Sequence, residues 1–235
     1  MTIGTSQHPR RRLSARDGGR AGFTLIELLV VIATIGILLG IAVPALNSAY
    51  ERAKVAKDLS NLRQMGLLMQ TYLNDKDQIL PATTTWPGTS VTPVLYPKYT
   101  GTRKVFQSPF DKRPSLETDL APVSYSINRN MYDPTVGISG NMLKVVSPAS
   151  TFLMAPTYNG NPANTSSWVG TATSAPDLPV GGTGETTGTH SNGARINVLF
   201  CDYHTETLTF GPAGTPGTFQ DTTSNLGLKH WDPRQ

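Results

Sequence analysis

The sequence is poor in the residues that define several common protein classes. Cys201 is the only cysteine among 235 residues, so no intramolecular disulfide can form and core packing must hold the fold. The chain has no Gly-x-Ser-x-Gly nucleophile elbow, no His-Glu-x-x-His zinc motif and no phosphate-binding P-loop. These absences give no support to an enzyme, and we expect no catalytic residue.

Charge is also sparse and, beyond the first 22 residues, balanced. The chain has 20 basic and 16 acidic residues. Removing the five arginines and one aspartate of residues 1–22 leaves 15 basic and 15 acidic residues. The basicity of the chain therefore belongs mainly to its leader, and it gives no reason to expect nucleic-acid binding.

A long apolar segment occupies residues 23–46, and Glu27 is its only ionisable side chain. These 24 residues form a helix of about 36 Å, enough to cross a hydrocarbon core of ~30 Å. The five arginines of residues 1–22 precede it, and positive charge on that flank keeps it in the cytoplasm. We expect a single-pass inner-membrane protein with a cytoplasmic leader and the rest of the chain outside.

Two plainer interpretations of this segment leave features unexplained. A secretory signal has an apolar core of about 7–15 residues, which is shorter than residues 23–46. An uncleaved signal anchor fits the hydropathy, but a charge at the bilayer centre costs roughly 2.5–3.5 kcal/mol on insertion scales. A place near the helix end lets Glu27 reach the interface and lowers that cost without removing it. The segment offers no Lys or Arg as a partner.

Residues 22–32 read Gly-Phe-Thr-Leu-Ile-Glu-Leu-Leu-Val-Val-Ile. This stretch resembles the processing motif of type IV prepilin-like proteins, the family of pilins and type II secretion pseudopilins. The resemblance implies cleavage by prepilin peptidase between Gly22 and Phe23 and N-methylation of the Phe23 amine. It also implies that Glu27 faces the terminal amine of a neighbouring subunit, which supplies the missing cation. Pro44 stands where pilins carry a proline.

Helical periodicity continues from residue 47 to residue 75. The predicted apolar stripe comprises Val55, Leu59, Leu62, Gly66, Met69 and Leu73, with Met65, Leu68 and Tyr72 nearby. The predicted polar face comprises Arg52, Lys54, Lys57, Asp58, Arg63 and Gln64. We expect an amphipathic continuation of the membrane helix whose stripe packs on a sheet.

The composition of residues 76–235 is typical of an exported β-rich domain, with short apolar runs separated by Gly, Pro, Thr, Ser and Asn. Strands are predicted at Val91–Leu95, Val123–Ile127, Leu143–Val146, Thr151–Ala155, Arg195–Phe200 and Thr205–Phe210. Residues 159–188 are predicted to form a long surface loop. One long helix followed by short strands predicts an α+β fold, with the helix across an antiparallel sheet.

A late segment resembles the C-terminal motif of a large bacterial prepilin-like group. In that motif a histidine is followed, after nine intervening residues, by Asp-Gly. Here eleven residues separate His190 from Asp202, and Tyr203 replaces the glycine. The segment predicts a hairpin whose turn is Cys201–His204. Because positive φ strains Tyr203, we expect a turn of a different kind from Asp-Gly. Other similar segments are Asn61–Gly66, Ser124–Asn128 and Ser147–Thr151.

The same hairpin raises the question of a metal site. Asp202, His204 and Glu206 would share one strand face, and with His190 they offer oxygen and imidazole ligands. A calcium site has an analogy in major pseudopilins, but the sequence has no acid-dense loop of EF-hand type. We favour a turn aspartate and solvated strand residues, and expect no metal or other cofactor.

These features predict a structural subunit of a type IV pilus-like or type II secretion pseudopilus filament, in the periplasm or at the cell surface. Expected partners are other copies, further pilin-like subunits, prepilin peptidase/methyltransferase and the inner-membrane assembly machinery. One alternative is a membrane-anchored binding module for glycan, peptide or secreted cargo, using residues 159–188 with Tyr158 and Trp168. The other is an anchored enzyme. The sequence leaves open pilus against pseudopilus and major against minor subunit.

Overall fold

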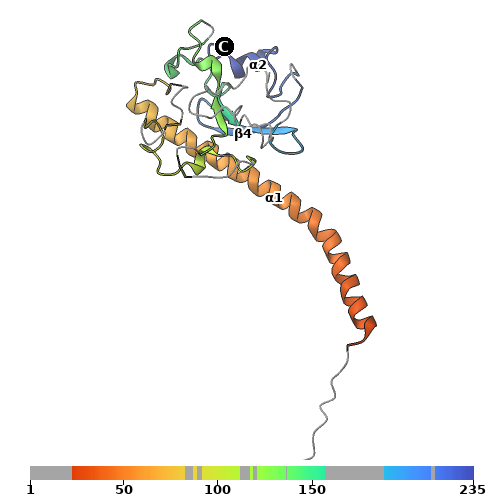
Figure 1. Ribbon diagram of the computed structural model, residues 1–235. Helices are drawn as coiled ribbons and strands as arrows, with labels where there is room; N and C mark the ends of the chain where they lie inside the picture. The colour runs from red at the N-terminus through yellow and green to blue at the C-terminus, as the bar shows by residue number, and fades with distance from the viewer. Residues whose placement is uncertain are drawn as a thin grey trace, which may run out of the picture. The chain divides into compact units, whose positions relative to one another are not determined.

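The structure is a computed structural model, and it describes residues 23–82, 87–88, 92–111, 117–118, 121–135, 137–156, 188–212 and 215–235. The chain divides into an N-terminal unit, residues 1–47, and a C-terminal unit, residues 48–235. Helix α1 (Leu25–Asp75) contributes to both units. The sheet and the remaining helices belong to the C-terminal unit (Figure 1).

The C-terminal unit combines the second part of α1 with an antiparallel sheet. The strands are β1 (Tyr125–Ile127), β2 (Phe152–Pro156), β3 (Arg195–Phe200) and β4 (Thr205–Thr209). The short helices are η2 (Lys104–Phe106), η3 (Arg129–Met131), η4 (Met142–Lys144) and α2 (Asn225–Trp231). Among the described residues the strands pair in the order β1-β2-β3-β4. The predicted α+β fold, a long helix on an antiparallel sheet, is confirmed.

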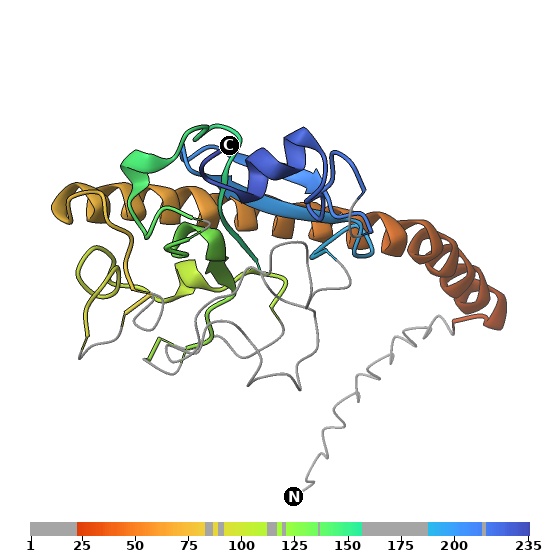
Figure 2. The same cartoon turned by 90° about the horizontal axis from the view of Figure 1, so that it is seen from above.

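The buried stripe of α1 lies against one face of this sheet (Figure 2). Four apolar side chains of α1 are fully buried there: Leu62, Met65, Met69 and Leu73. Gly66 marks the closest approach, because a Cβ built on it would lie 3.2 Å from Leu199 Cδ1 and 3.4 Å from Tyr203 Cβ. The helical spacing thus located the helix–sheet contact correctly.

The opposite face of the sheet carries a second, aromatic cluster that the sequence did not predict. Alternate residues of β3 join it, as the pleat of a strand requires: Ile196, Val198 and Phe200. They pack with Phe152, Phe210, Phe219 and Trp231. Trp231 ends α2, whose first turn is capped by Ser224 accepting from the Gly227 amide at 3.1 Å. The sheet is therefore covered on both faces.

Asp58 corrects the predicted polar face of α1, because its side chain is fully buried. One carboxylate oxygen accepts hydrogen bonds from Ser108 Oγ and Tyr125 Oη, each at 2.6 Å. The other accepts from Asn197 Nδ2 at 2.8 Å. Buried acids need such partners. These come from a loop, β1 and β3, so one carboxylate ties the helix to three distant parts of the domain.

Burial raises the pKa of Asp58, and the hydrogen bonds from Ser108, Tyr125 and Asn197 oppose that rise. A carboxyl with a raised folded-state pKa contributes most stability in its protonated form, below its unfolded pKa. That contribution is lost as the pH rises through the folded-state pKa. The three hydrogen bonds therefore limit what the buried charge costs at neutral pH.

Two predicted strands are wrong. Residues 92–95, the described part of Val91–Leu95, form no strand: Pro93 has no amide, and the Leu95 amide donates to the Pro87 carbonyl at 3.0 Å. Residues 143–146 form no strand either. The Asn141 side chain accepts a hydrogen bond from the Leu143 amide at 3.0 Å and caps η4, which includes Leu143 and Lys144. Of the predicted loop at residues 159–188, residues 159–187 lie outside the described residues, as do Tyr158 and Trp168.

The predicted β3–β4 hairpin is confirmed, but the expectation about its turn was wrong. Tyr203 adopts a φ of 71°, the left-handed conformation that a glycine would take. The Phe200 amide donates to the His204 carbonyl and the Tyr203 amide to the Phe200 carbonyl, both at 3.0 Å. The partly buried Tyr203 ring packs on the core beneath α1, and this packing offsets the backbone strain.

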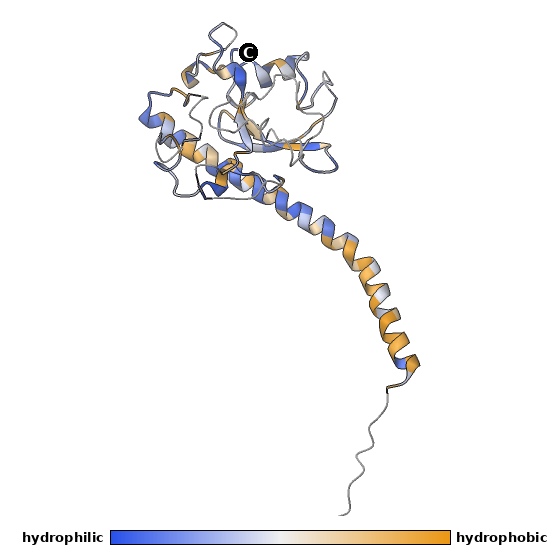
Figure 3. Cartoon of the chain, in the orientation of Figure 1, coloured by the Kyte–Doolittle hydropathy of each residue, from blue (hydrophilic) through white to orange (hydrophobic). Residues whose placement is uncertain are grey.

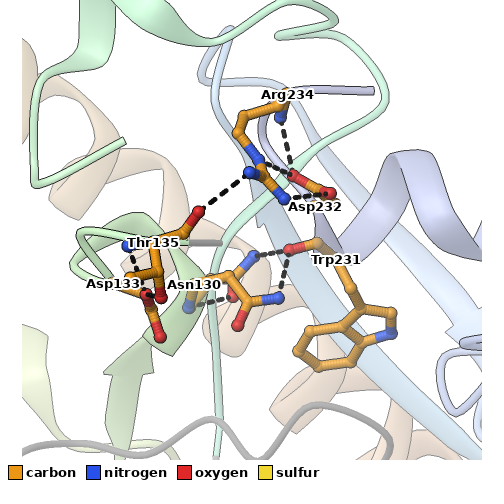
Figure 4. Close-up of polar contacts among 7 residues, drawn as sticks. Asn130, Asp133, Thr135, Trp231, Asp232 and Arg234 are labelled. Carbon is orange, nitrogen blue, oxygen red and sulfur yellow. Dashed lines mark hydrogen bonds and ion pairs between the residues drawn. The ribbon is translucent and has the colours of Figure 1, made fainter. Parts of the chain in front are cut away.

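The C-terminus is tied to the middle of the chain. The Trp231 carbonyl accepts from Asn128 Nδ2 at 3.2 Å and from Asn130 Nδ2 at 3.0 Å. Arg234 pairs with Asp232 at 3.0 Å and donates from Nη1 to the Thr135 carbonyl at 3.1 Å. Figure 4 displays these contacts. They hold the end of α2 against the segment that follows β1.

The Asp58 network yields a prediction with a matched control. At pH 7, Tyr125→Phe should lower the free energy of unfolding by about 1.5–3 kcal/mol, because a bond to a charged carboxylate is lost. Tyr132→Phe should cost about 1 kcal/mol, because the Tyr132 hydroxyl donates to the neutral Pro81 carbonyl at 2.8 Å. Urea unfolding of the full chain in detergent measures both.

The difference between these two variants should shrink in acid. Below the folded-state pKa of Asp58 its carboxyl is protonated, so the Tyr125 hydroxyl then donates to a neutral group and not to a charged carboxylate. Equal costs for the two variants at pH 7 would contradict the assignment of charge to the buried Asp58.

Candidate processing and assembly site

Helix α1 begins at Leu25, directly after Thr24, and Glu27 closes its first turn. The Thr24 amide and hydroxyl both donate to Glu27 Oε2, at 2.9 and 2.8 Å. The Glu27 amide donates back to Thr24 Oγ1 at 3.3 Å. This reciprocal arrangement is a capping box, which satisfies two amides that a helix start otherwise leaves without partners.

The capping box is a role for Glu27 that the sequence reasoning missed. The signal was present, since Thr-x-x-Glu before an apolar run is the capping-box pattern. The cap supplies hydrogen bonds and no positive charge. No ion pair joins Glu27 to a basic side chain in the part of the chain that the structure describes. Glu27 is therefore held in place, and its charge has no cationic partner among the described residues.

Phe23 and the apolar residues after it are exposed in the isolated chain. Phe23 is 76% exposed, Leu25 87% and Ile41 73%. Of the described residues, α1 is the one helix with a segment long and apolar enough to cross a membrane. Figure 3 marks the change along α1, from a continuous hydrophobic stretch to a mixed surface. So large an apolar surface belongs in lipid or against other helices.

Two backbone features lie in the second half of this segment. A Cβ built on Gly36 or Gly40 would meet nothing within 4 Å, so both positions are open to an approaching helix. Pro44 lies inside α1 and has no amide to donate to the Gly40 carbonyl. Gly22, the other predicted processing residue, lies outside the described residues.

The four late candidates for a metal site are not brought together. His190 pairs with Arg195 at the start of β3, whereas Asp202 and His204 lie in the turn after its end. His204 Nδ1 lies 2.5 Å from Asp202 Oδ1 on an exposed surface. Glu206 faces Val198 in the β3–β4 pairing. Across the described ranges, no three His, Cys, Asp or Glu side chains gather as a metal would require.

Comparison with known proteins found one family match near the N-terminus and several curated relatives. The family described as Prokaryotic N-terminal methylation motif matches residues 18–43. The type IV major pilin protein PilA of Myxococcus xanthus is 36% identical over 67 residues, 28% of this chain and 30% of that protein. A type IV major fimbrial protein FimA of Dichelobacter nodosus is 44% identical over 54 residues, 23% of this chain and 35% of that protein.

Another FimA of Dichelobacter nodosus is 36% identical over 70 residues, 30% of this chain and 45% of that protein. The chain thus spans less than half the length of these curated relatives. No solved structure matched the chain. The methylation motif, the relatives and the exposed apolar start of α1 agree: the chain carries a prokaryotic N-terminal methylation motif and is similar to type IV major pilins over part of its length.

Proposed function

We propose that the chain is a structural subunit of a type IV pilus-like or type II secretion pseudopilus filament and not an enzyme. The observation that carries the proposal is the methylation motif at residues 18–43, which lies on the exposed apolar start of α1. An apolar helix of this kind can exchange lipid for other subunits without exposing its surface to water. The relatives named as major pilins support the same role.

The proposed sequence of events begins with the chain spanning the inner membrane, its leader in the cytoplasm and residues 48–235 outside. Prepilin peptidase cleaves between Gly22 and Phe23, and the new Phe23 amine is N-methylated. The inner-membrane assembly machinery then transfers the subunit into a filament in the periplasm or at the cell surface. Copies of this chain and other pilin-like subunits are its partners there.

In the filament, Glu27 compensates the charged amine of an adjacent subunit and helps to set the axial register. The capping box supports this role because it fixes Oε2 at the helix start before any neighbour arrives. Both ions lose water when they pair, so the pairing selects register more than it adds stability. Pro44 and the open positions Gly36 and Gly40 belong to the same assembly surface.

The processing step predicts a defined N-terminus. Mass spectrometry of the chain from expressing cells should find N-methylated Phe23 as the first residue. Gly22→Ala should leave the leader attached, because it changes the glycine that precedes the proposed cleavage site. Electrophoresis separates the precursor from the shortened product.

Ala21→Gly serves as the matched control, since it changes the neighbouring residue and leaves Gly22 in place; it should be processed normally. An intact leader on the wild-type chain would favour a plain membrane anchor. Normal shortening of Gly22→Ala would contradict the proposed cleavage site.

Two substitutions separate the cap from the charge of Glu27. The side-chain oxygen of Gln accepts the Thr24 hydrogen bonds as that of Glu does, so Glu27→Gln keeps the cap and removes the charge. Glu27→Ala removes both. If the charge compensates a neighbouring amine, both variants should be processed normally and both should be nearly absent from sheared filaments.

Thr24→Ala completes the set, because it removes the hydroxyl that joins the cap and leaves the Glu27 charge. This variant should retain most of its filament yield. Wild-type yield from Glu27→Gln with loss only in Glu27→Ala and Thr24→Ala would assign Glu27 to capping alone.

A further inference from the structure

A cleft of about 350 Å³ lies within the C-terminal unit, between α1 and the segment that leads into β3. Val55, Ala56 and Leu59 of α1 form its apolar wall. Val55 and Leu59 belong to the predicted core stripe, yet they are only half-buried. Arg52 and Arg195 line the same cleft from α1 and β3. An apolar wall with a few polar groups is the usual build of a small-ligand site.

His190 also lines this cleft and is only 5% exposed. Its ring stacks on Phe110, with 5.4 Å between ring centroids, and its Nδ1 lies 3.0 Å from Thr189 Oγ1. Its Nε2 is buried and has no hydrogen-bond partner among the described residues. When the Thr189 hydroxyl donates to Nδ1, the ring proton resides on Nε2, which is then an unused donor.

The charges around the cleft favour a monoanion. Glu51 Oε1 accepts from the Ser191 amide at 2.6 Å beside the cleft. Arg52 and Arg195 together with this carboxylate leave one net positive charge. Burial lowers the pKa of His190; the Glu51 charge opposes this effect, and the Arg195 charge adds to it. The lowered pKa favours the neutral imidazole, so His190 adds no second positive charge to the cleft.

We propose that the cleft formed by Arg52, Arg195 and His190 binds a monoanionic carboxylate carried on an apolar group. Guanidinium groups bind carboxylate oxygens through charge-assisted hydrogen bonds. The His190 ring lines the same cleft, and the wall of α1 covers the apolar group. The carboxylate comes either from a free organic acid or from an Asp or Glu side chain of a second copy. The site does not depend on processing or filament formation.

Benzoate is a suitable probe, and benzamide is its uncharged counterpart of the same shape. Titration of the full chain in detergent should move the ¹⁵N signal of His190 Nε2 in a saturable way with benzoate and not with benzamide. Arg52→Gln and Arg195→Gln should each raise the Kd about tenfold. Lys57→Gln removes the same charge from an exposed position of α1 outside the cleft, and it should leave the Kd unchanged.

An unmoved Nε2 signal, equal binding of benzamide or equal weakening by Lys57→Gln would overturn the proposal. Tighter binding of inorganic phosphate than of benzoate would overturn the assignment of a monoanion. Titration at two protein concentrations then identifies the source. Competition from a second copy makes the apparent Kd rise with protein concentration, whereas a constant Kd assigns the site to a free organic acid.

Discussion

The apolar first part of α1 is exposed and packs against no other described residue, and this constraint decides which environments suit the protein. Leu25 and Ile41 are 87% and 73% exposed, whereas Leu62 and Met65 further along the helix are fully buried. Moving such a surface out of water lowers the free energy by about 25 cal/mol per Å² of apolar area. The segment is therefore stable only in lipid or packed against similar helices. The proposed function uses both environments in turn, first as an anchor and then as a filament contact.

Two carboxylates interrupt apolar stretches of α1, and they differ in how far the sequence could explain them. The Glu27 cap is local, and its Thr-x-x-Glu spacing could have been identified from the sequence. Asp58 accepts from Ser108, Tyr125 and Asn197, which lie 50, 67 and 139 residues away. Polarity put Asp58 on the solvent face, although it lies four residues before Leu62 on the buried stripe. Only tertiary structure could reveal the donors that make its burial tolerable.

In the sheet, too, the elements set by neighbouring residues were predictable from the sequence, and those set by distant contacts were not. The β3–β4 hairpin was predictable because its strands are neighbours, and α1 was predictable from its spacing. The strand predicted at residues 143–146 does not form, because Asn141 caps a short helix there. Leu143, although apolar, is 76% exposed and pairs with no strand. His190 and Asp202 lie at opposite ends of β3. The residues between them form β3 and the turn before it, and this strand separates the two side chains.

In the proposed filament, the cap that holds Glu27 and its charge compensation would reinforce each other. Oε2 accepts both Thr24 bonds, and an ionised carboxylate has further lone pairs for a cation. The proposed cleavage would create an amine at Phe23, one residue before the Thr24 amide that Glu27 already binds. The helix dipole also places positive potential at this end of α1. A subunit's own amine and that of its neighbour thus compete for one acceptor. Because the cap holds that acceptor in a fixed position, the geometry of the neighbouring helix decides which amine it binds, and this makes the carboxylate sensitive to register.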